Sequence, residues 1–331
     1  MKKIKIAQIG TSKNSHGNQI WNSIIKQTDI FDVIGYALPE NEKEKFPQQA
    51  KAFTQYREMT VEEILSNPEI EAVAVETEEV YLTKYAIMVA VAGKHLHMEK
   101  PGGIILSDFE KLVGILKLKG LTFSTGYMYR FNPKIKEVLK RIKNGELGEI
   151  YSVEAHMDCK HPSDVRQWLG NFPGGMLFFL GCHLIDLIYQ IQGEHLEVIP
   201  LSCSTHGDGI STYDYGMVIF KYKNGVSFVK TCANECGGFL RRQLVICGEK
   251  GTIEIKPLEV EVQDGLYTVM HETYSTDWYE PWNETKTDLY NRYDDMIRNF
   301  AEMIRGKENP YTYDYELNLY KLILNACGKE I

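Results

Sequence analysis

Short apolar segments alternate with amphipathic ones through the first third of the chain, and this alternation constrains the fold more than any other feature. Apolar runs of about four to eight residues indicate buried strands, and apolar residues every three or four positions indicate helices. The expected strands cover residues 3–9, 31–38, 71–75, 94–98 and 121–126, and the expected helices 17–27, 61–66, 79–92 and 107–119. Because crossovers between parallel strands are right-handed, residues 1–125 are predicted to form a doubly wound parallel sheet.

After residue 125 a second pattern begins. Strands follow one another directly from residue 196 to 263, and Asn224-Gly225 between two alternating runs is a strong hairpin signal. Further expected elements are a strand over 150–158 and helices over 132–143, 174–191, 288–305 and 314–327. The sequence therefore predicts an α/β protein in two domains, in which residues 126–331 form an α+β domain around a large, mostly antiparallel open sheet.

Net charge and cysteine content limit the classes of binding partner and indicate the cellular compartment. The formal net charge is −8 and no basic patch interrupts it, which disfavours nucleic acid and anionic membranes as partners. No uninterrupted run of about 18 apolar residues is present, and the first residues resemble a strand more than a signal peptide. Seven cysteines without ligand spacing predict a reduced, cytoplasmic protein with no metal site.

The loop after the first strand, IGTSKNSHGN, lies where open parallel sheets bind ligands. It matches the dinucleotide-binding pattern G-x-G-x-x-G only at Gly10, because Ser12 and Ser15 replace the other two glycines. Its small polar residues and the adjoining helix start still suit an anion, to which Lys13 would add charge. From these residues alone, a cofactor-binding loop and a plain strand–helix turn are both open.

The second strand ends without the acid that usually binds a ribose hydroxyl. Leu38 occupies the place of that acid, so the residues do not choose between NAD and NADP. Lys43 and Lys45 follow in the loop, and they are compatible with a 2′-phosphate or with ordinary solvated side chains.

The segment HLHMEKPGG places Lys100 directly after a strand. Pro101 biases Lys100 toward extended backbone, which projects its side chain from the carboxyl end of the sheet into the expected ligand crevice. A desolvated lysine loses its proton more readily than a solvated one, so it can exchange a proton near neutral pH. The alternative is a surface lysine at the end of a strand.

The segment GGMLFFLGCHLIDLIYQI, residues 174–191, is almost wholly apolar but contains His183 and Asp186. In a helix, residues three apart share a face, and Phe179 and Gln190 are expected on that face too. A buried acid needs a partner, and the neighbouring imidazole is one candidate. Either His183 serves a binding or catalytic site, or it is a hydrogen-bonded histidine of the core.

Five motifs together resemble one known family. EKP, GYMYRFNP, NGELGEI, GGMLFFLGCHLIDL and YELNLYKLILNACG occur in the order and spacing of the Gfo/Idh/MocA oxidoreductases, the glucose–fructose oxidoreductase and inositol dehydrogenase family. The resemblance extends over nearly the whole chain. It implies a Rossmann domain, a substrate-binding domain, and NAD(P)-dependent hydride transfer at a carbinol carbon of a sugar, polyol or related small molecule.

The resemblance also implies roles for individual residues. Lys100 and His183 match the family's catalytic lysine and histidine, and Asp186 matches an orienting or anchoring residue. The residues expected to bind the cofactor are Gly10, Thr11, Ser12, Lys13, Leu38, Thr77, Glu99 and Lys100. The residues expected to bind substrate are Arg130, Trp168, Phe179 and Asp186.

Departures from the family pattern leave two alternatives open. Ser12, Leu38 and Phe179 replace a glycine, the ribose-binding acid and a substrate-binding carboxylate, which favours a degenerate member that binds ligands without turnover. NAD-assisted glycoside cleavage, also known in the family, is the other alternative. A broad sheet with one uncovered face further predicts a homodimer or homotetramer, chiefly because the family implies it.

Overall fold

The structure is a computed structural model that describes residues 2–330. The chain divides into two compact units, one of residues 1–127 and 293–320 and the other of residues 128–292 and 321–331. The sequence analysis placed residues 293–320 in the second domain, whereas the structure groups them with the first unit. Hydrogen bonds hold them there, because the Ser23 hydroxyl donates to Asp294 and the Thr125 hydroxyl donates to Glu316, each at 2.9 Å. Within residues 2–330, no helix has the length and apolar character needed to cross a membrane.

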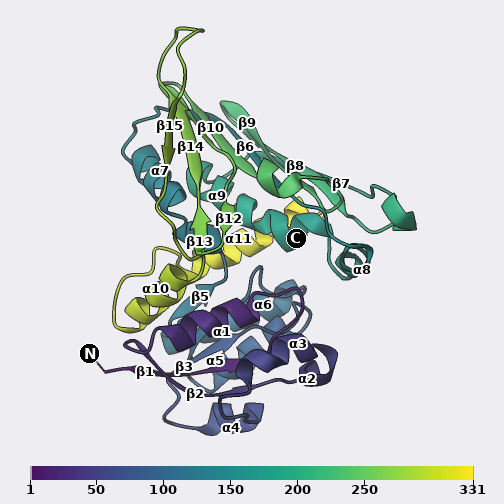
Figure 1. The fold of residues 1–331 in the computed structure, drawn as a ribbon, viewed down its shortest axis with the longest axis vertical. Helices are drawn as coiled ribbons and strands as arrows, with labels where there is room; N and C mark the ends of the chain where they lie inside the picture. The colour runs from purple at the N-terminus through teal and green to yellow at the C-terminus, as the bar shows by residue number, and fades with distance from the viewer. Residues whose placement is uncertain (1, 331) are drawn as a thin grey trace. The chain divides into compact units, whose positions relative to one another are not determined.

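The first unit contains the predicted doubly wound parallel sheet (Figure 1). Its strands are β1 (Ile4–Ile9), β2 (Phe31–Ala37), β3 (Ala72–Val75), β4 (His95–Met98) and β5 (Phe123–Thr125), in the spatial order β2-β1-β3-β4-β5. The larger helices are α1 (Gly17–Lys26), α4 (Val61–Ser66), α5 (Leu82–Val91), α6 (Leu106–Lys119) and α10 (Asp294–Ile304). Every residue of β3 is buried, as expected for a central strand with helices on both faces.

The strand order reverses between β1 and β3, which places the expected ligand position at their carboxyl ends. After β2, two short helices that the sequence analysis treated as loop, α2 (Glu42–Lys45) and α3 (Pro47–Ala50), interrupt the connection. These four-residue helices are too short to show a helical period, so the sequence pattern did not predict them.

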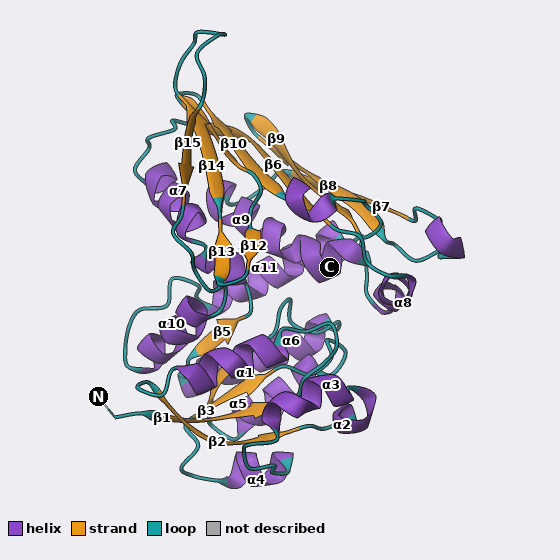
Figure 2. Cartoon of the chain, viewed as in Figure 1, coloured by secondary structure: helices purple, strands orange, loops and turns teal. Residues whose placement is uncertain are grey.

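The second unit is built on the predicted large open sheet (Figure 2). The described strands are β6 (Ile150–Asp158), β7 (Glu197–Cys203), β8 (Tyr215–Tyr222), β9 (Gly225–Cys232), β10 (Gln243–Gly248), β11 (Gly251–Ile255), β14 (Val269–Thr273) and β15 (Asn283–Lys286), in the order β15-β14-β11-β10-β6-β9-β8-β7. Only the pair β6–β9 is parallel among these described strands. The hairpin expected at this point is confirmed, since Tyr222 pairs with Gly225, although the two turn residues are Lys223 and Asn224 and Gly225 begins β9.

The remaining elements complete the two units. A small separate hairpin joins β12 (Val260–Val262) to β13 (Gly265–Tyr267). The helices of the second unit are α7 (Pro133–Lys143), α8 (Ser163–Trp168) and α9 (Cys182–Gln192), and α11 (Tyr313–Ala326) has residues in both units. Along β8, β9 and β10, residues on one face are buried and residues on the other are half-buried or exposed, so the sheet has one poorly covered face.

Candidate active site

Glycine is required where β1 meets the loop after β3. Gly10 has a φ of +90°, and a Cβ atom there would lie 2.3 Å from Cγ2 of Thr77, so no larger residue fits. Gln8, buried in β1, holds the loop in place because its side-chain amide donates to the carbonyls of Gly10 and Gly17, both at 3.0 Å. The structure therefore brings together two predicted cofactor residues, Gly10 and Thr77, at the switch point of the sheet.

Two serines replace the missing glycines and fold the loop by themselves. The Ser12 hydroxyl accepts the backbone N–H groups of Asn14 at 3.3 Å and Ser15 at 2.9 Å. The Ser15 hydroxyl accepts those of Ser12 at 3.1 Å and Gly17 at 3.2 Å. Because a hydroxyl that accepts hydrogen bonds can still donate its own proton, Ser12 can bind an anion such as a dinucleotide phosphate. This loop, at the start of α1, therefore fits a dinucleotide.

The residues at the end of β2 do not lie as the fingerprint would place them. Leu38 packs against a core cluster of Trp21, Tyr36 and Phe53. In its place, the carboxylate of Glu42 from α2 reaches the loop and accepts the backbone N–H of Thr11 at 3.1 Å. Glu42 is fully buried, and the sequence analysis did not single it out as a site residue because it lies four positions past the expected acid.

Glu99 connects the predicted lysine to the start of α1. Its Oε1 accepts the backbone N–H of Lys100 at 2.8 Å. Its Oε2 accepts the backbone N–H of His16 at 3.1 Å and lies 2.9 Å from the Nδ1 atom of the same residue. Burial alone would raise the pKa of Glu99, but the neighbouring His16 and Lys100 outweigh it and hold that pKa well below its ordinary value. Glu99 is therefore a buried carboxylate that stays ionised.

Two more buried acids, Glu76 and Glu79, follow β3 and interact electrostatically with Lys100. Burial and the charge of Glu99 raise the pKa of Glu76 well above its ordinary value, although Lys100 opposes the shift. Burial likewise raises the pKa of Glu79 to about 7, again against Lys100. Lys100 itself is only 1% exposed, so it is a buried amine among carboxyl groups of different proton affinity, not a surface lysine.

In the second unit, His183 lies at the start of α9, directly after a π-helical turn over Leu177–Gly181. Such turns often occur at functional sites. The His183 ring is buried and meets the ring of Tyr129 edge-on, with 5.5 Å between the ring centroids. The Tyr129 hydroxyl donates to Glu259 at 3.1 Å, and Arg292 also donates to Glu259, so the ring beside His183 is fixed.

Arg130 and Asp186, both predicted to contact substrate, form a buried ion pair with each other. Arg130 donates from Nε to one carboxylate oxygen at 2.9 Å and from Nη2 to the other at 2.8 Å. Gln190 adds a third hydrogen bond to Asp186 at 2.9 Å. This bidentate geometry gives both charges a partner inside the second unit and ties α9 to the 3₁₀ turn that carries Arg130.

Phe179 and Trp168, the other two predicted substrate residues, lie in one aromatic cluster. Their rings meet edge-on at 5.0 Å, and Trp168 also meets Phe172 at 4.6 Å. Phe179 therefore packs against α8, while His183 packs against Tyr129. The sequence analysis expected Phe179 and His183 on one helical face, but the intervening π-helical turn changes the spacing of side chains between them.

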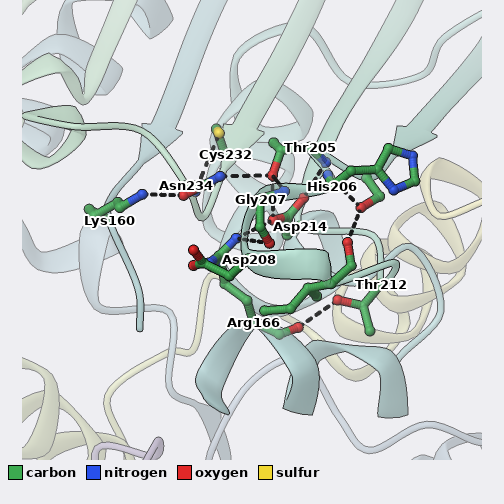
Figure 3. A network of polar contacts seen from close by, with 12 residues as sticks. Lys160, Arg166, Thr205, His206, Gly207, Asp208, Thr212, Asp214, Cys232 and Asn234 are labelled. Carbon is green, nitrogen blue, oxygen red and sulfur yellow. Dashed lines mark hydrogen bonds and ion pairs between the residues drawn. The ribbon is translucent and has the colours of Figure 1, made fainter. Parts of the chain in front are cut away.

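A polar network anchors α8, the helix that carries Trp168 (Figure 3). Arg166, fully buried, donates to the carboxylate of Asp214 at 3.2 Å and to the carbonyl of Gly207 at 3.1 Å, and pairs with Asp208. Asp214 also accepts the backbone N–H and the hydroxyl of Thr205, at 2.7 and 2.8 Å. The network fixes the loop between β7 and β8 against α8.

The predicted site residues thus fall into two groups. The cofactor residues and Lys100 lie in the first unit, while His183, Arg130, Trp168, Phe179 and Asp186 lie in the second. Lys13 is exposed at the rim of its loop. No group of three or more potential metal ligands occurs among residues 2–330. The sequence analysis missed the buried polar residues Gln8, Glu76 and Glu79. They share one signal, since each is an acid or amide within a buried strand or shortly after one.

Comparison with known families decides the classification. Residues 4–127 match the model of an oxidoreductase family with an NAD-binding Rossmann fold, and residues 135–254 match the C-terminal domain of the same GFO/IDH/MocA family. The chain belongs to the Gfo/Idh/MocA oxidoreductase family. The predicted family and fold class are therefore confirmed, as is an NAD(P)-type cofactor whose choice is open.

Individual relatives in this family are distant. The chain is 33% identical over 135 residues to the uncharacterized oxidoreductase YhhX of Escherichia coli. The aligned segment covers 40% of this chain and 39% of that protein. It is 22% identical over 231 residues to myo-inositol 2-dehydrogenase of Thermotoga maritima, with 68% of each chain covered. The 3-ketoreductase KijD10 of Actinomadura kijaniata, solved with NADP and TDP-benzene, has a TM-score of 0.79 at 17% identity over 97% of this chain and 96% of that one.

Proposed function

We propose that this protein is an NAD(P)-dependent oxidoreductase that transfers hydride at a CH–OH carbon of a sugar, polyol or similar small molecule. The observation that carries the proposal is the buried amine of Lys100 among Glu76, Glu79 and Glu99, at the carboxyl ends of strands in an NAD-binding fold. The myo-inositol 2-dehydrogenase relative supports the substrate class. The nicotinamide, when bound, accepts or supplies the hydride.

The chain's own residues would bind the cofactor and move the proton. Gly10, Thr11, Ser12 and Thr77 would bind the cofactor, with its phosphates at the start of α1. During oxidation, Lys100 would accept the hydroxyl proton of the substrate and pass it to the carboxyl cluster of Glu76, Glu79 and Glu99. In the protonated state, its positive charge would stabilise a developing alkoxide. His183, fixed against Tyr129, is proposed as the second acid or base or as a residue that orients the substrate.

Remaining parts of the proposal concern substrate contacts and assembly. Trp168 and Phe179 would offer aromatic rings to a sugar face. The pair Arg130 and Asp186 would act mainly by holding α9 in place. The poorly covered face of the large sheet supports association into a homodimer or homotetramer.

A ligand-binding or regulatory protein without redox catalysis is a second candidate. It is favoured because backbone N–H groups of the loop, as at Thr11 and His16, already have protein partners and are not available to a cofactor phosphate. Titration of nucleotide-free protein with NADH and NADPH, followed by fluorescence, tests both. Binding of either cofactor, together with reduction of NAD(P)⁺ by a panel of polyols and sugars, supports the oxidoreductase. Binding without any turnover supports the second candidate, and binding of neither cofactor contradicts the oxidoreductase and also supports the second candidate.

A further inference from the structure

We propose that Glu42 replaces the missing acid of β2 as the residue that binds the adenosine ribose, so that this chain selects NAD(H) over NADP(H). The inference rests on the proposed dinucleotide-binding function and deepens it. Leu38 turns into the core, and Glu42 is the carboxylate that reaches the loop after β1. The cofactor choice then depends on a residue outside the usual position.

The two oxygens of Glu42 are in different states. Oε2 accepts the backbone N–H of Thr11 at 3.1 Å, next to Gly10 at the switch point of the sheet. Oε1 has no hydrogen-bond partner among the described residues, although the side chain is fully buried. A buried polar atom without a partner is destabilising, and a ligand hydroxyl would satisfy it. A ribose hydroxyl both donates and accepts, so it suits this oxygen in either protonation state.

The backbone before Glu42 holds it in this position. Glu40 and Asn41 have φ values of +58° and +57°, in the left-handed region that residues other than glycine rarely adopt. Glu40 is fixed by Lys84, which donates at 2.5 Å, and by the hydroxyl of Tyr85, which donates at 2.7 Å. The tight bend turns α2 back so that the Glu42 side chain reaches the loop after β1.

The positive charges near this position are already paired. Lys43 donates to Glu58 at 2.7 Å, and Lys45 lies 3.5 Å from Glu78. A 2′-phosphate is normally bound by cations, and here either lysine would have to leave its acid to reach it. The carboxyl of Glu42 offers no compensating charge, so the additional phosphate of NADP(H) is expected to be disfavoured.

Burial also affects the protonation of Glu42. Burial, only partly opposed by the Thr11 N–H, raises its pKa to about 9. Without a ligand this carboxyl is therefore neutral near pH 7. A ribose hydroxyl that donates to Oε1 favours the ionised form, which the amide of Glu42→Gln cannot adopt. The charges of Glu78, Lys45 and Glu40 act on the same group.

The test is equilibrium binding of NADH and NADPH to the full chain, measured by calorimetry and by fluorescence, for the wild type, Glu42→Ala, Glu42→Gln and the control Glu44→Gln. Glu44 is an exposed acid on the same helix. The wild type and the control are expected to bind NADH at least about tenfold more tightly than NADPH. Both Glu42 variants are expected to lose most of this preference, chiefly through weaker NADH binding.

The measured affinities for NADH and NADPH decide whether Glu42 binds the ribose. A wild type that binds NADPH as tightly as NADH overturns the proposal, and so does an unchanged NADH-to-NADPH ratio in the Glu42 variants. Tighter binding of both cofactors in the variants would show that Glu42 blocks the loop instead of serving it. If Glu42→Ala does not fold by circular dichroism, Glu42→Gln, which keeps an acceptor for Thr11, carries the test. A wild type that binds neither cofactor contradicts the proposed function itself.

Discussion

Glu79 gives the first unit a pH-dependent stability. Its pKa is raised by burial from an ordinary value of 4.5 to about 7, and neither of its oxygens has a hydrogen-bond partner on another described residue. Between these two values the unfolded chain ionises Glu79 while the folded chain keeps it neutral. The folded state therefore binds more protons in this window, and the contribution of Glu79 lowers stability as pH rises from 4.5 to about 7.

Glu79→Gln should remove this dependence. We expect the stability of the variant relative to the wild type to increase from pH 5 to pH 8 by up to about 3 kcal/mol. Urea unfolding at the two pH values measures the difference. Glu62→Gln, on the exposed surface of α4, is the control and should show no such change. A relative stability that is constant with pH would contradict the raised pKa.

Lys100 and His183 should affect turnover far more than folding. Lys100→Ala is expected to reduce kcat by orders of magnitude while NAD(P)H binding persists, because the proton no longer has a buried amine to move through. His183→Ala is expected to lower kcat likewise. Steady-state kinetics with the preferred substrate and cofactor titrations measure the two effects separately.

Two matched variants serve as controls for these residues. Lys94 is also a buried lysine, but it donates to the carbonyls of Asn67 and Ile70, so Lys94→Met should lower stability without lowering kcat. His195, a half-buried histidine in the connection between α9 and β7, is the control for the imidazole, and His195→Ala should leave kcat unchanged. Undiminished turnover in Lys100→Ala would overturn its assignment, and a change of KM alone in His183→Ala would restrict that residue to binding.

At the scale of elements, the Arg130–Asp186 pair holds α9 to the turn that precedes α7. Asp186→Asn removes the charge that Arg130 needs, and a buried charge left without a partner costs about 3–5 kcal/mol. We expect a loss of stability of that size in urea unfolding. The double variant Arg130→Met, Asp186→Leu should recover much of it, since paired apolar residues leave no uncompensated charge. A single variant as stable as the wild type would contradict the structural role.

Periodicity predicted most of the elements but not the chemistry between them. Strands and helices of the first unit lie within a few residues of the predicted ranges, because each has a clear apolar period. The π-helical turn before His183 has no such signature, so the sequence analysis treated residues 174–191 as one regular helix. Glu42 was missed because its position depends on the left-handed backbone of Glu40 and Asn41, which no sequence pattern announced.

Pairing between predicted residues was equally hidden. Arg130 and Asp186 were both assigned to substrate, and the sequence did not reveal that they bind each other across 56 positions of the chain. Lys100 and Glu99, by contrast, follow directly from the EKP motif at the end of a strand. Motifs of neighbouring residues could be predicted from the sequence, whereas ion pairs between residues far apart in the chain became visible only in the structure.

At the scale of the whole molecule, the poorly covered face of the large sheet leads to a prediction about the oligomeric state. Ile199 and Leu201 on β7 are 38% and 46% exposed, and they pair with Ile219 and Met217 on β8. An apolar stripe of this kind is typical of a subunit interface.

The double variant Ile199→Glu, Leu201→Glu is expected to lower the oligomeric mass measured by sedimentation velocity. Leu118→Glu, an 85% exposed site on α6, is the control and should leave the mass unchanged. A wild type that is monomeric at all concentrations, or a variant with the wild-type mass, would exclude this face as the interface.

The first unit combines two stretches that lie far apart in the sequence, residues 1–127 and 293–320. Asn309 donates to the carbonyl of Phe123 at 3.0 Å, Tyr320 donates to the carbonyl of Gly103 at 3.1 Å, and the Phe300 ring lies 5.8 Å from that of His97. On a ribosome, the parallel sheet emerges long before these contacts can form, so its apolar surface near β4 and β5 stays uncovered until residues 293–320 have emerged. A nascent chain arrested before residue 293 should therefore remain open to proteases in its first unit, and extension of the chain beyond residue 320 should protect it.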